Sequence, residues 1–194
     1  PLRHSSAASD VYKRQALDNS KDARRFTSAI LHNSERLTEM VTNLIDLSRI
    51  EYGDKQFNLE EIDLKNKINS VVEAMSNLAA EKNIKFKFDY VGDALVKADH
   101  SALEQVLNNL LENSIKYSNP DSAVEIKIRK QDNFYKVSIM DTGSGIEEHE
   151  STLVFNRFYR TAKARAESKD GSGLGLAIVK HLVNQLGGEV GVMP

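Results

Sequence analysis

The apolar residues of this 194-residue chain follow two periods, and the change between them falls near Gly53. Between residues 18 and 51 there is no proline or glycine, and apolar side chains recur every three or four residues, which is typical of an amphipathic helix. The positions of this apolar face are Phe26, Ile30, Leu37, Val41, Leu44 and Leu47. A single helix cannot cover its own apolar face, so the following domain or a second copy of the chain must cover it. A plain surface helix is the alternative.

After Gly53, short alternating segments and helical segments follow one another. Ser101 and Glu104 have the spacing of a capping box, which predicts the start of a helix there. The expected strands are 56–62, 85–90, 124–129, 135–140 and a short one after Gly188, and the expected helices are 64–81, 101–117 and 175–186. This order predicts an α+β fold, with helices on one face of a mixed, largely antiparallel sheet, preceded by the long helix.

Composition removes several classes of function. The 26 basic and 28 acidic side chains give a net charge of -2, which provides no reason to propose a nucleic-acid partner. Without cysteine there is no disulfide, thiol nucleophile or cysteine metal site. No apolar run approaches the ~18 residues of a membrane-spanning helix, and no signal-peptide pattern opens the chain, so we expect this piece to be soluble.

One face of the helix expected at 101–117 is polar. Its members lie at i, i+3, i+4 and i+7 and are Asn109, Glu112, Asn113 and Lys116. The leucines and the isoleucine of this helix point largely elsewhere, toward a core. Such a face is usually only solvated, and on its own it would not indicate a site.

Two glycine-containing motifs follow. Asp141 stands where the 135–140 strand should end, and a turn with Gly143 and Gly145 follows at once. Three alternating glycines, residues 171, 173 and 175, then lead into an apolar helical run, an arrangement that suits phosphate because the helix N-terminus offers N–H groups and positive partial charge. Neither a P-loop nor a dinucleotide fingerprint is present, and a lone glycine motif is weak evidence.

Taken together, the segments 109–117, 141–145, 155–160 and 171–176 resemble the N, G1, F and G2 boxes of the sensor histidine kinase ATP-binding domain, in order and in separation. Residues 35–50 are similar to the second helix of the kinase dimerisation hairpin. The resemblance covers about residues 20–193. It implies a partial dimerisation helix at 16–53 and an ATP-binding catalytic domain at 54–194, with the two-layer α/β sandwich (Bergerat-type) shared with gyrase-type and heat-shock ATPases.

The resemblance also implies ATP and Mg²⁺ as cofactors and gives the polar helix face its roles. Asn113 would be a Mg²⁺ ligand, supported by Asn109, since an amide oxygen is a neutral hard donor. Lys116 would direct its charge toward phosphate, and Tyr117 would lie near the nucleoside. Glu112 is the candidate general base that polarises an acceptor imidazole.

The other three motifs receive roles in the same way. Asp141 would accept a hydrogen bond from the adenine amino group, while Gly143 and Gly145 let the backbone approach the base. The stretch 163–170 resembles the mobile lid over the nucleotide, and Arg160 would reach the terminal phosphate from its start. Arg157 is a weaker candidate, and Phe155 and Phe158 are expected to pack and dock the lid. The phosphate loop would comprise Gly171, Gly173, Leu174, Gly175 and Leu176.

In this family phosphate passes from ATP to a histidine in a His-Glu/Asp-x-x-x-Pro motif and then to a response-regulator aspartate. None of the five histidines stands in such a motif; they are His4, His32, His100, His149 and His181. We therefore expect a protein-histidine kinase region that binds Mg²⁺-ATP but does not phosphorylate itself. The parent is expected to be a cytoplasmic homodimer with a response-regulator partner, reaching a membrane only through other segments. An ATP-responsive binding module and a related ATPase are the alternatives.

Both ends of the chain look cut. Residues 5–15 resemble the in-frame translation of a transposon sequencing adapter, so 1–15 is expected to be a non-native leader; a natural disordered leader is the alternative. The family continues with a further strand after the position of residue 194.

Overall fold

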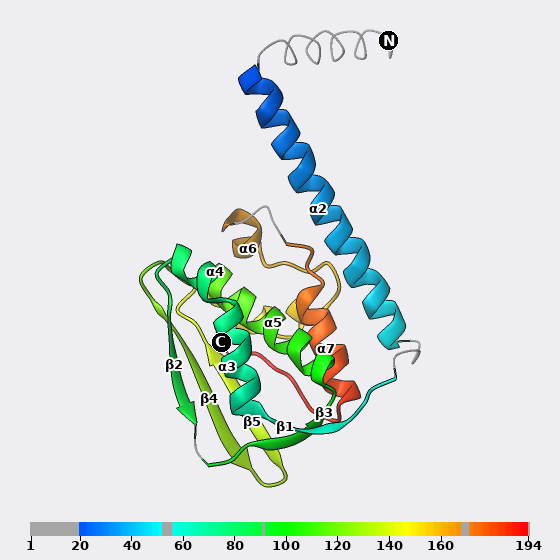
Figure 1. Ribbon diagram of the computed structural model, residues 1–194, viewed down its shortest axis with the longest axis vertical. Coiled ribbons are helices and arrows are strands. Elements are labelled where there is room, and N and C mark those ends of the chain that lie inside the picture. The colour runs from blue at the N-terminus through cyan, green and yellow to red at the C-terminus, as the bar shows by residue number, and fades with distance from the viewer. Residues whose placement is uncertain (1–19, 52–55, 91, 168–170, 194) are drawn as a thin grey trace. The chain divides into compact units, whose positions relative to one another are not determined.

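The computed structural model describes residues 20–51, 56–90, 92–167 and 171–193 (Figure 1). The chain divides into two compact units, Pro1–Thr42 and Asn43–Pro194. Helix α2 (Ser20–Glu51) is the described part of the first unit and continues into the second. The long helix predicted from the apolar spacing is therefore confirmed, while the leader and the predicted helix end at Gly53 lie outside the described residues.

The apolar face of α2 differs between the two units. In the first unit Phe26, Ile30 and Leu37 are each more than half exposed. In the second unit Leu47 is fully buried. The expectation that another surface covers the rest of this face stays a prediction.

The strands of the second unit form two small sheets. The larger sheet has the order β2 (Lys85–Tyr90), β4 (Ala123–Gln131) and β5 (Phe134–Met140). The pair β2–β4 is parallel and the pair β4–β5 antiparallel. The smaller sheet pairs β1 (Glu60–Asp63) antiparallel with β3 (Leu95–Ala98). The mixed, largely antiparallel sheet predicted from the sequence is confirmed.

Helices α3 (Leu64–Ala74), α4 (Ser76–Glu81) and α5 (His100–Tyr117) cover one face of the larger sheet. The later elements are the short 3₁₀ turns η1 (Glu148–Glu150) and η2 (Leu153–Phe155) and the helices α6 (Ala162–Glu167) and α7 (Gly175–Gln185). In Figure 1, α3 and α5 lie against the sheet of β2, β4 and β5, and α7 lies beside α5. The second unit is thus a two-layer α/β sandwich.

Alternation along β4 decides which face the helices cover. Val124, Ile126 and Ile128 are fully buried, whereas Glu125 and Lys127 between them are partly exposed. Because successive side chains of a strand point to opposite faces, one side of the sheet is apolar and the other is charged. Only the apolar side can gain from being covered by helices.

Helix α5 is packed on two sides. Leu107, Leu111 and Ile115 join the core beneath the sheet, and Val106 joins a second core with α7 that also contains Leu47. Two buried sides leave α5 one remaining stripe, which carries the polar face expected from the sequence.

Several elements differ from the prediction. The strand expected at 56–62 forms only over Glu60–Asp63. The helix expected at 64–81 is interrupted at Met75 and becomes α3 and α4. Strand β3 was not expected, and the short strand expected after Gly188 does not form; Val190 there packs against the second core instead. Both strand errors have one cause, because a strand exists only with a hydrogen-bonded neighbour that local periodicity does not reveal.

The cap of α5 is Asp99, so the capping box expected at Ser101 is wrong. Oδ1 of Asp99 accepts from the backbone N–H groups of Ser101 (3.0 Å) and Ala102 (2.9 Å), and Oδ2 accepts from Asn58 N–H (2.9 Å). The bond from the Ala102 N–H, followed by the bond from the Ser101 hydroxyl, lowers the pKa of Asp99 to about 2 against the opposing effect of burial. A carboxylate carries a full negative charge, which suits the positive end of the helix dipole better than a neutral hydroxyl does. Asp99 therefore caps α5 in place of Ser101.

Replacing Asp99 with alanine is expected to lower the free energy of unfolding by about 2 kcal/mol at pH 7. The folded pKa lies below the value of about 3.9 in an unfolded chain, so this stabilisation is complete above about pH 4 and is lost as pH falls to about 2. Urea unfolding at pH 7 and pH 3 measures both effects. Asp99→Asn should keep most of the stability without the pH dependence, and exposed Asp93→Ala is the control. Equal stability of wild type and Asp99→Ala at pH 7 would contradict the assignment.

Candidate functional site

The polar face of α5 is the foundation of the site. Asn109, Asn113 and Lys116 are partly buried on this helix, and Glu112 is exposed. The buried positions Leu111 and Ile115 hold the opposite face in the core. The structure therefore brings the four polar residues to one surface because the core fixes the rotation of the helix.

The turn after β5 is docked against the end of α5. Oδ1 of Asp141 accepts a hydrogen bond from the N–H of Gly143 at 2.9 Å. A Cβ built on Gly143 would lie 2.4 Å from the carbonyl oxygen of Tyr117, closer than real Cβ atoms approach any heavy atom. Only glycine allows this contact. Gly145, two residues later, has a φ of +69°, which L side chains rarely adopt.

A hydrogen bond from outside the predicted motifs also holds this turn. The side-chain amide of Asn119 donates to the carbonyl oxygen of Thr142 at 2.7 Å. The sequence analysis did not single out Asn119, because no local pattern shows that the asparagine reaches Thr142.

Two cations meet at the beginning of the glycine loop. A Cβ built on Gly171, whose φ is +129°, would lie 3.3 Å from Nζ of Lys116 and 3.6 Å from Cζ of Arg160. Lys116 comes from α5, and Arg160 comes from the segment before α6, so the fold joins two motifs here. This is the part of the site that is suited to polyanionic phosphate.

The rest of the glycine loop is packed against two other motifs. The carbonyl oxygen of Gly173 accepts from the N–H of Phe158 at 2.9 Å, and a Cβ on Gly173 would lie 2.8 Å from the carbonyl carbon of Phe158. A Cβ on Gly175 would lie 2.5 Å from Oδ1 of Asn109, whose amide nitrogen donates to the carbonyl of Gln105 at 2.8 Å. The start of α7 therefore touches the polar face of α5 directly.

The N-terminus of α7 presents backbone N–H groups at the end of the glycine loop. No side chain caps this helix at Leu174, so its first N–H groups are not taken by a cap. The side chain of Leu174 is fully buried in the second core, which leaves only its main chain for a ligand, and Leu176 is partly buried.

The segment 155–160 reaches the site through Arg160. Phe155 is buried, as expected, but Phe158 is 62% exposed with a φ of +61°, so the expectation that it packs is wrong. Its backbone is bound to Gly173, which turns the ring outward. Tyr159 donates to Oε1 of Glu150 at 2.9 Å, and this bond raises the pKa of Tyr159.

The lid region holds Arg160 from the other side. Nη2 of Arg160 donates to the carbonyl of Ala164 in α6 at 2.7 Å. Lys163 of α6 donates to the carbonyl of Ser144 at 3.4 Å, which links the lid to the Asp141 turn. Residues 168–170 of the expected lid lie outside the described residues.

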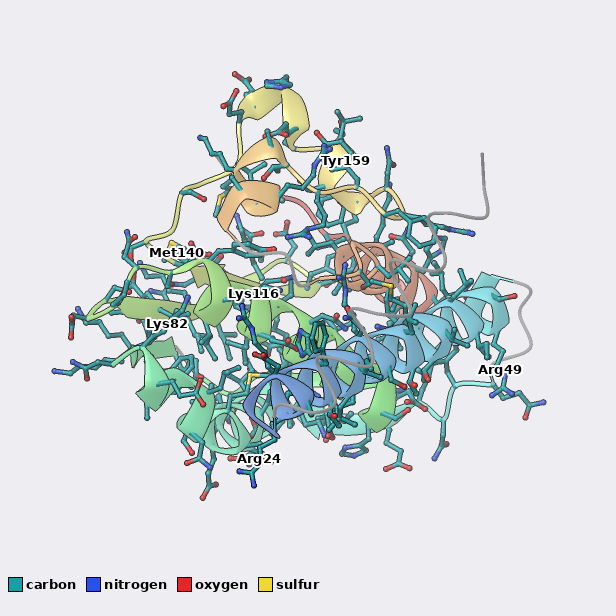
Figure 2. The ribbon with its side chains drawn as sticks, turned by 90° about the horizontal axis from the view of Figure 1, so that it is seen from above. Arg24, Arg49, Lys82, Lys116, Met140 and Tyr159 are labelled. Carbon is teal, nitrogen blue, oxygen red and sulfur yellow. The ribbon has the colours of Figure 1, made fainter. Side chains whose placement is uncertain are left out.

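A cavity of about 370 Å³ opens between the end of α5 and the Asp141 turn. It is lined by Lys82, Lys116, Tyr117, Ser118, Asn119, Gly143 and Ser144. No motif pointed to Lys82, which follows α4 in the chain and lines this cavity. Figure 2 labels Lys82 and Lys116, the two lysines of this cavity.

Metal and membrane features are limited in the part of the chain that the structure describes. No group of three or more His, Asp or Glu side chains there could hold a metal ion. The amide oxygen of Asn113 still suits Mg²⁺, because that ion keeps several waters and takes its other ligands from phosphate. Within the same described residues, the helices are too short or too polar to cross a lipid bilayer.

A two-layer sandwich with a polar helix face, a docked Asp turn and a glycine loop beside two cations defines the class of nucleotide-binding α/β domains. Comparison with known proteins agrees. Residues 98–194 match the family model "Histidine kinase-, DNA gyrase B-, and HSP90-like ATPase". The sensor-like histidine kinase SenX3 of Mycobacterium tuberculosis is 34% identical over 175 residues, covering 90% of this chain and 43% of that protein.

Solved structures show the same fold. Full-length ShkA in complex with AMPPNP matches with a TM-score of 0.73 and 27% identity, over 91% of this chain and 36% of that one. The histidine kinase ThkA in complex with the response regulator TrrA matches with a TM-score of 0.75 at 20% identity, over 97% of this chain and 52% of that one. The chain spans less than half the length of the curated relative SenX3. It belongs to the histidine kinase-, DNA gyrase B- and HSP90-like ATPase family, as the ATP-binding catalytic region of a sensor histidine kinase.

Proposed function

We propose that this chain binds Mg²⁺-ATP on the polar face of α5 and transfers the γ-phosphate to a histidine, for relay to an aspartate of a response regulator. The convergence of Lys116 and Arg160 at Gly171 carries this proposal. The Asp141 turn lies against the same last turn of α5, at Tyr117. One helix end thus has a cationic side for phosphates and a hydrogen-bonding side for a base.

The base would be recognised at the Asp141 turn. Asp141 accepts from the adenine amino group, and Gly143 and Gly145 let the backbone come close to the ring. Tyr117 offers an aromatic surface next to the nucleoside. The 2.9 Å bond from the Gly143 N–H supports this role, because it holds one carboxylate oxygen and leaves the other for a ligand.

The phosphates and the metal would lie between α5 and the glycine loop. Asn113 ligates Mg²⁺ with support from Asn109, and Lys116 and Arg160 contact phosphate oxygens. When bound, Mg²⁺ neutralises charge on the phosphates. The first N–H groups of α7, from Gly175 and Leu176, and the loop at Gly171 and Gly173 complete the phosphate contacts.

Glu112 would polarise the acceptor imidazole. It is exposed on α5 between Asn109 and Asn113, where a histidine of another segment can reach it. The chain contains no His-Glu/Asp-x-x-x-Pro motif, so the acceptor histidine is supplied by a separate hairpin in the assays below.

The organisation of the parent protein is part of the proposal. Residues 1–15 are a non-native leader, residues 16–53 belong to a dimerisation helix and residues 54–194 form the catalytic domain. The exposed apolar side chains of α2 support a homodimer through this helix, since they need a cover. The parent acts in the cytoplasm on a response regulator, as the ThkA–TrrA pairing suggests by analogy.

Titration of the chain with ATP by calorimetry tests the site. Asp141→Ala is expected to weaken ATP binding about thirtyfold with or without Mg²⁺, because a hydrogen bond to a charged group is worth about 2 kcal/mol. Asn113→Ala is expected to abolish the gain in affinity that Mg²⁺ gives to wild type, while binding without Mg²⁺ stays unchanged.

Exposed Asp93→Ala and Asn133→Ala are the matched controls and should bind like wild type. A folded wild type that binds no ATP would refute the proposed function. An Asn113→Ala variant that keeps the full gain in affinity with Mg²⁺ would show that Asn113 is not the metal ligand.

A further inference from the structure

We infer that Lys82 is a positioning residue for the nucleoside end of this site, an inference that rests on the proposed function. Lys82 follows α4 and lies far in sequence from the four predicted motifs. Its ammonium donates to the carbonyl oxygens of Ile115 (3.2 Å), Lys116 and Ser118 (3.3 Å) at the end of α5. It therefore acts on the helix that carries the site, while lining the cavity beside it.

In this contact the number of hydrogen-bond donors equals the number of acceptors. An ammonium group has three N–H donors and no acceptor, and three carbonyl oxygens surround it. The last carbonyls of a helix have no partner within the helix and carry negative partial charge. Lys82 satisfies these acceptors with its full charge. With all three donors used on carbonyls, it is placed to hold α5 rather than to contact a phosphate.

Further bonds join the turn at Lys82 to the loop after α5. The carbonyl oxygen of Lys82 accepts from the N–H of Asp121 at 2.9 Å, and the amide of Asn83 donates to Oδ1 of Asp121 at 2.7 Å. The N–H of Lys85 donates to the carbonyl of Ser122 at 3.0 Å. The loop 118–122 is thus fixed to the start of β2.

The loop 118–122 and the end of α5 in turn contact the Asp141 turn. Asn119 donates to Thr142, and the carbonyl oxygen of Tyr117 lies against Gly143. Lys82 therefore fixes Tyr117 and, through it, the Asp141 turn. Asn113 lies one turn earlier in α5, before the carbonyls that Lys82 binds, so the metal end is independent of it.

Removal of the ammonium should loosen Tyr117 and the Asp141 turn together. If the competent arrangement is then populated about a tenth of the time, affinity falls about tenfold. Adenosine and ATP should both weaken about tenfold or more, because both ligands depend on the nucleoside contacts. ATP should lose no less than adenosine, since Lys82 also binds the carbonyl of Lys116, which contacts phosphate in the proposed site. The Mg²⁺ dependence of ATP binding should stay as in wild type.

The experiment titrates wild type, Lys82→Met and Lys82→Arg with adenosine and with ATP, each with and without Mg²⁺, well below the melting temperature. Lys85→Met, an exposed lysine three residues away, is the control and should bind like wild type. Lys82→Arg keeps the charge with a different donor geometry, so its loss should be about threefold. If Lys82→Met does not fold, Lys82→Arg tests the inference by itself.

Weakening of both adenosine and ATP, with partial recovery in Lys82→Arg, supports the inference. Weakening of ATP alone would make Lys82 a phosphate contact and overturn it. A lower melting temperature with unchanged affinities would reduce Lys82 to a structural role and overturn it as well. If wild type binds neither ligand, the proposed function is wrong, and this inference falls with it.

Discussion

Gly143→Ala is expected to weaken ATP binding about a hundredfold, equivalent to about 2.7 kcal/mol. The new methyl group would stand 2.4 Å from the Tyr117 carbonyl oxygen and 2.9 Å from Oδ1 of Asp141. Both neighbours are fixed, since Tyr117 ends α5 and Asp141 is bound by the Gly143 N–H. The turn must move away, and Asp141 moves with it.

Gly145 and Gly191 separate this steric effect from other effects of adding a methyl group. At Gly145 no heavy atom lies within 4 Å of an added Cβ, but φ is +69°. Gly145→Ala should therefore lower the free energy of unfolding by only about 1 kcal/mol, through backbone strain. Gly191→Ala has neither a clash nor a positive φ, so it should leave ATP affinity and thermal unfolding unchanged. Calorimetric titration with ATP measures the three variants, and thermal unfolding reports whether each is folded. A Gly143→Ala variant that binds like Gly191→Ala would show that the turn is free to shift.

The site residues on α5 could be predicted from the sequence because their placement is local. A period of 3.6 residues puts Asn109, Asn113 and Lys116 on one face, and the apolar period puts Leu111 and Ile115 in the core. The glycines were also visible. Their packing was not, because the atoms that exclude a side chain at Gly143 or Gly175 come from a different element.

Contacts between distant segments explain what the sequence did not reveal. Lys82 binds carbonyls more than thirty residues away, which no periodicity encodes. Asp99, which caps α5 in place of Ser101, also binds the N–H of Asn58, forty-one residues before it, and this contact has no local signal. Strand β3 could not be predicted for the same reason, since its only local signal was four residues long and its partner β1 decides the pairing.

In the segment 155–160, one feature could be predicted from the sequence and another could not. Its position beside the glycine loop followed from the order of motifs, and Arg160 does lie at Gly171. The orientation of Phe158 did not follow, because the bond between its N–H and the Gly173 carbonyl forces a left-handed backbone at a non-glycine residue. Such a conformation costs about 1 kcal/mol and is set by tertiary contacts.

Arg160→Ala is expected to slow phosphate transfer to an acceptor histidine about a thousandfold at saturating ATP. The guanidinium lies at Gly171 with Lys116, and the carbonyl of Ala164 orients it. A cation held there can stabilise the charge that spreads over the phosphoryl oxygens during transfer. Binding of ATP itself should change only a few fold, because Lys116 and the backbone N–H groups remain.

Arg157 is the matched control in the same motif. Arg157 is exposed, and after burial its charge lowers the pKa of His181 in α7, whereas the atoms nearest a Cβ built on Gly171 belong to Lys116 and Arg160. Arg157→Ala should therefore leave the transfer rate within about threefold, whereas Arg160→Lys should recover part of the loss, because lysine keeps the charge without the planar fork. Transfer of radiolabel from ATP to a separate helical hairpin that carries the acceptor motif measures all three rates. Equal rates for Arg160→Ala and Arg157→Ala would show that Arg160 takes no part in transfer, and Lys116 would then be the remaining cation at Gly171.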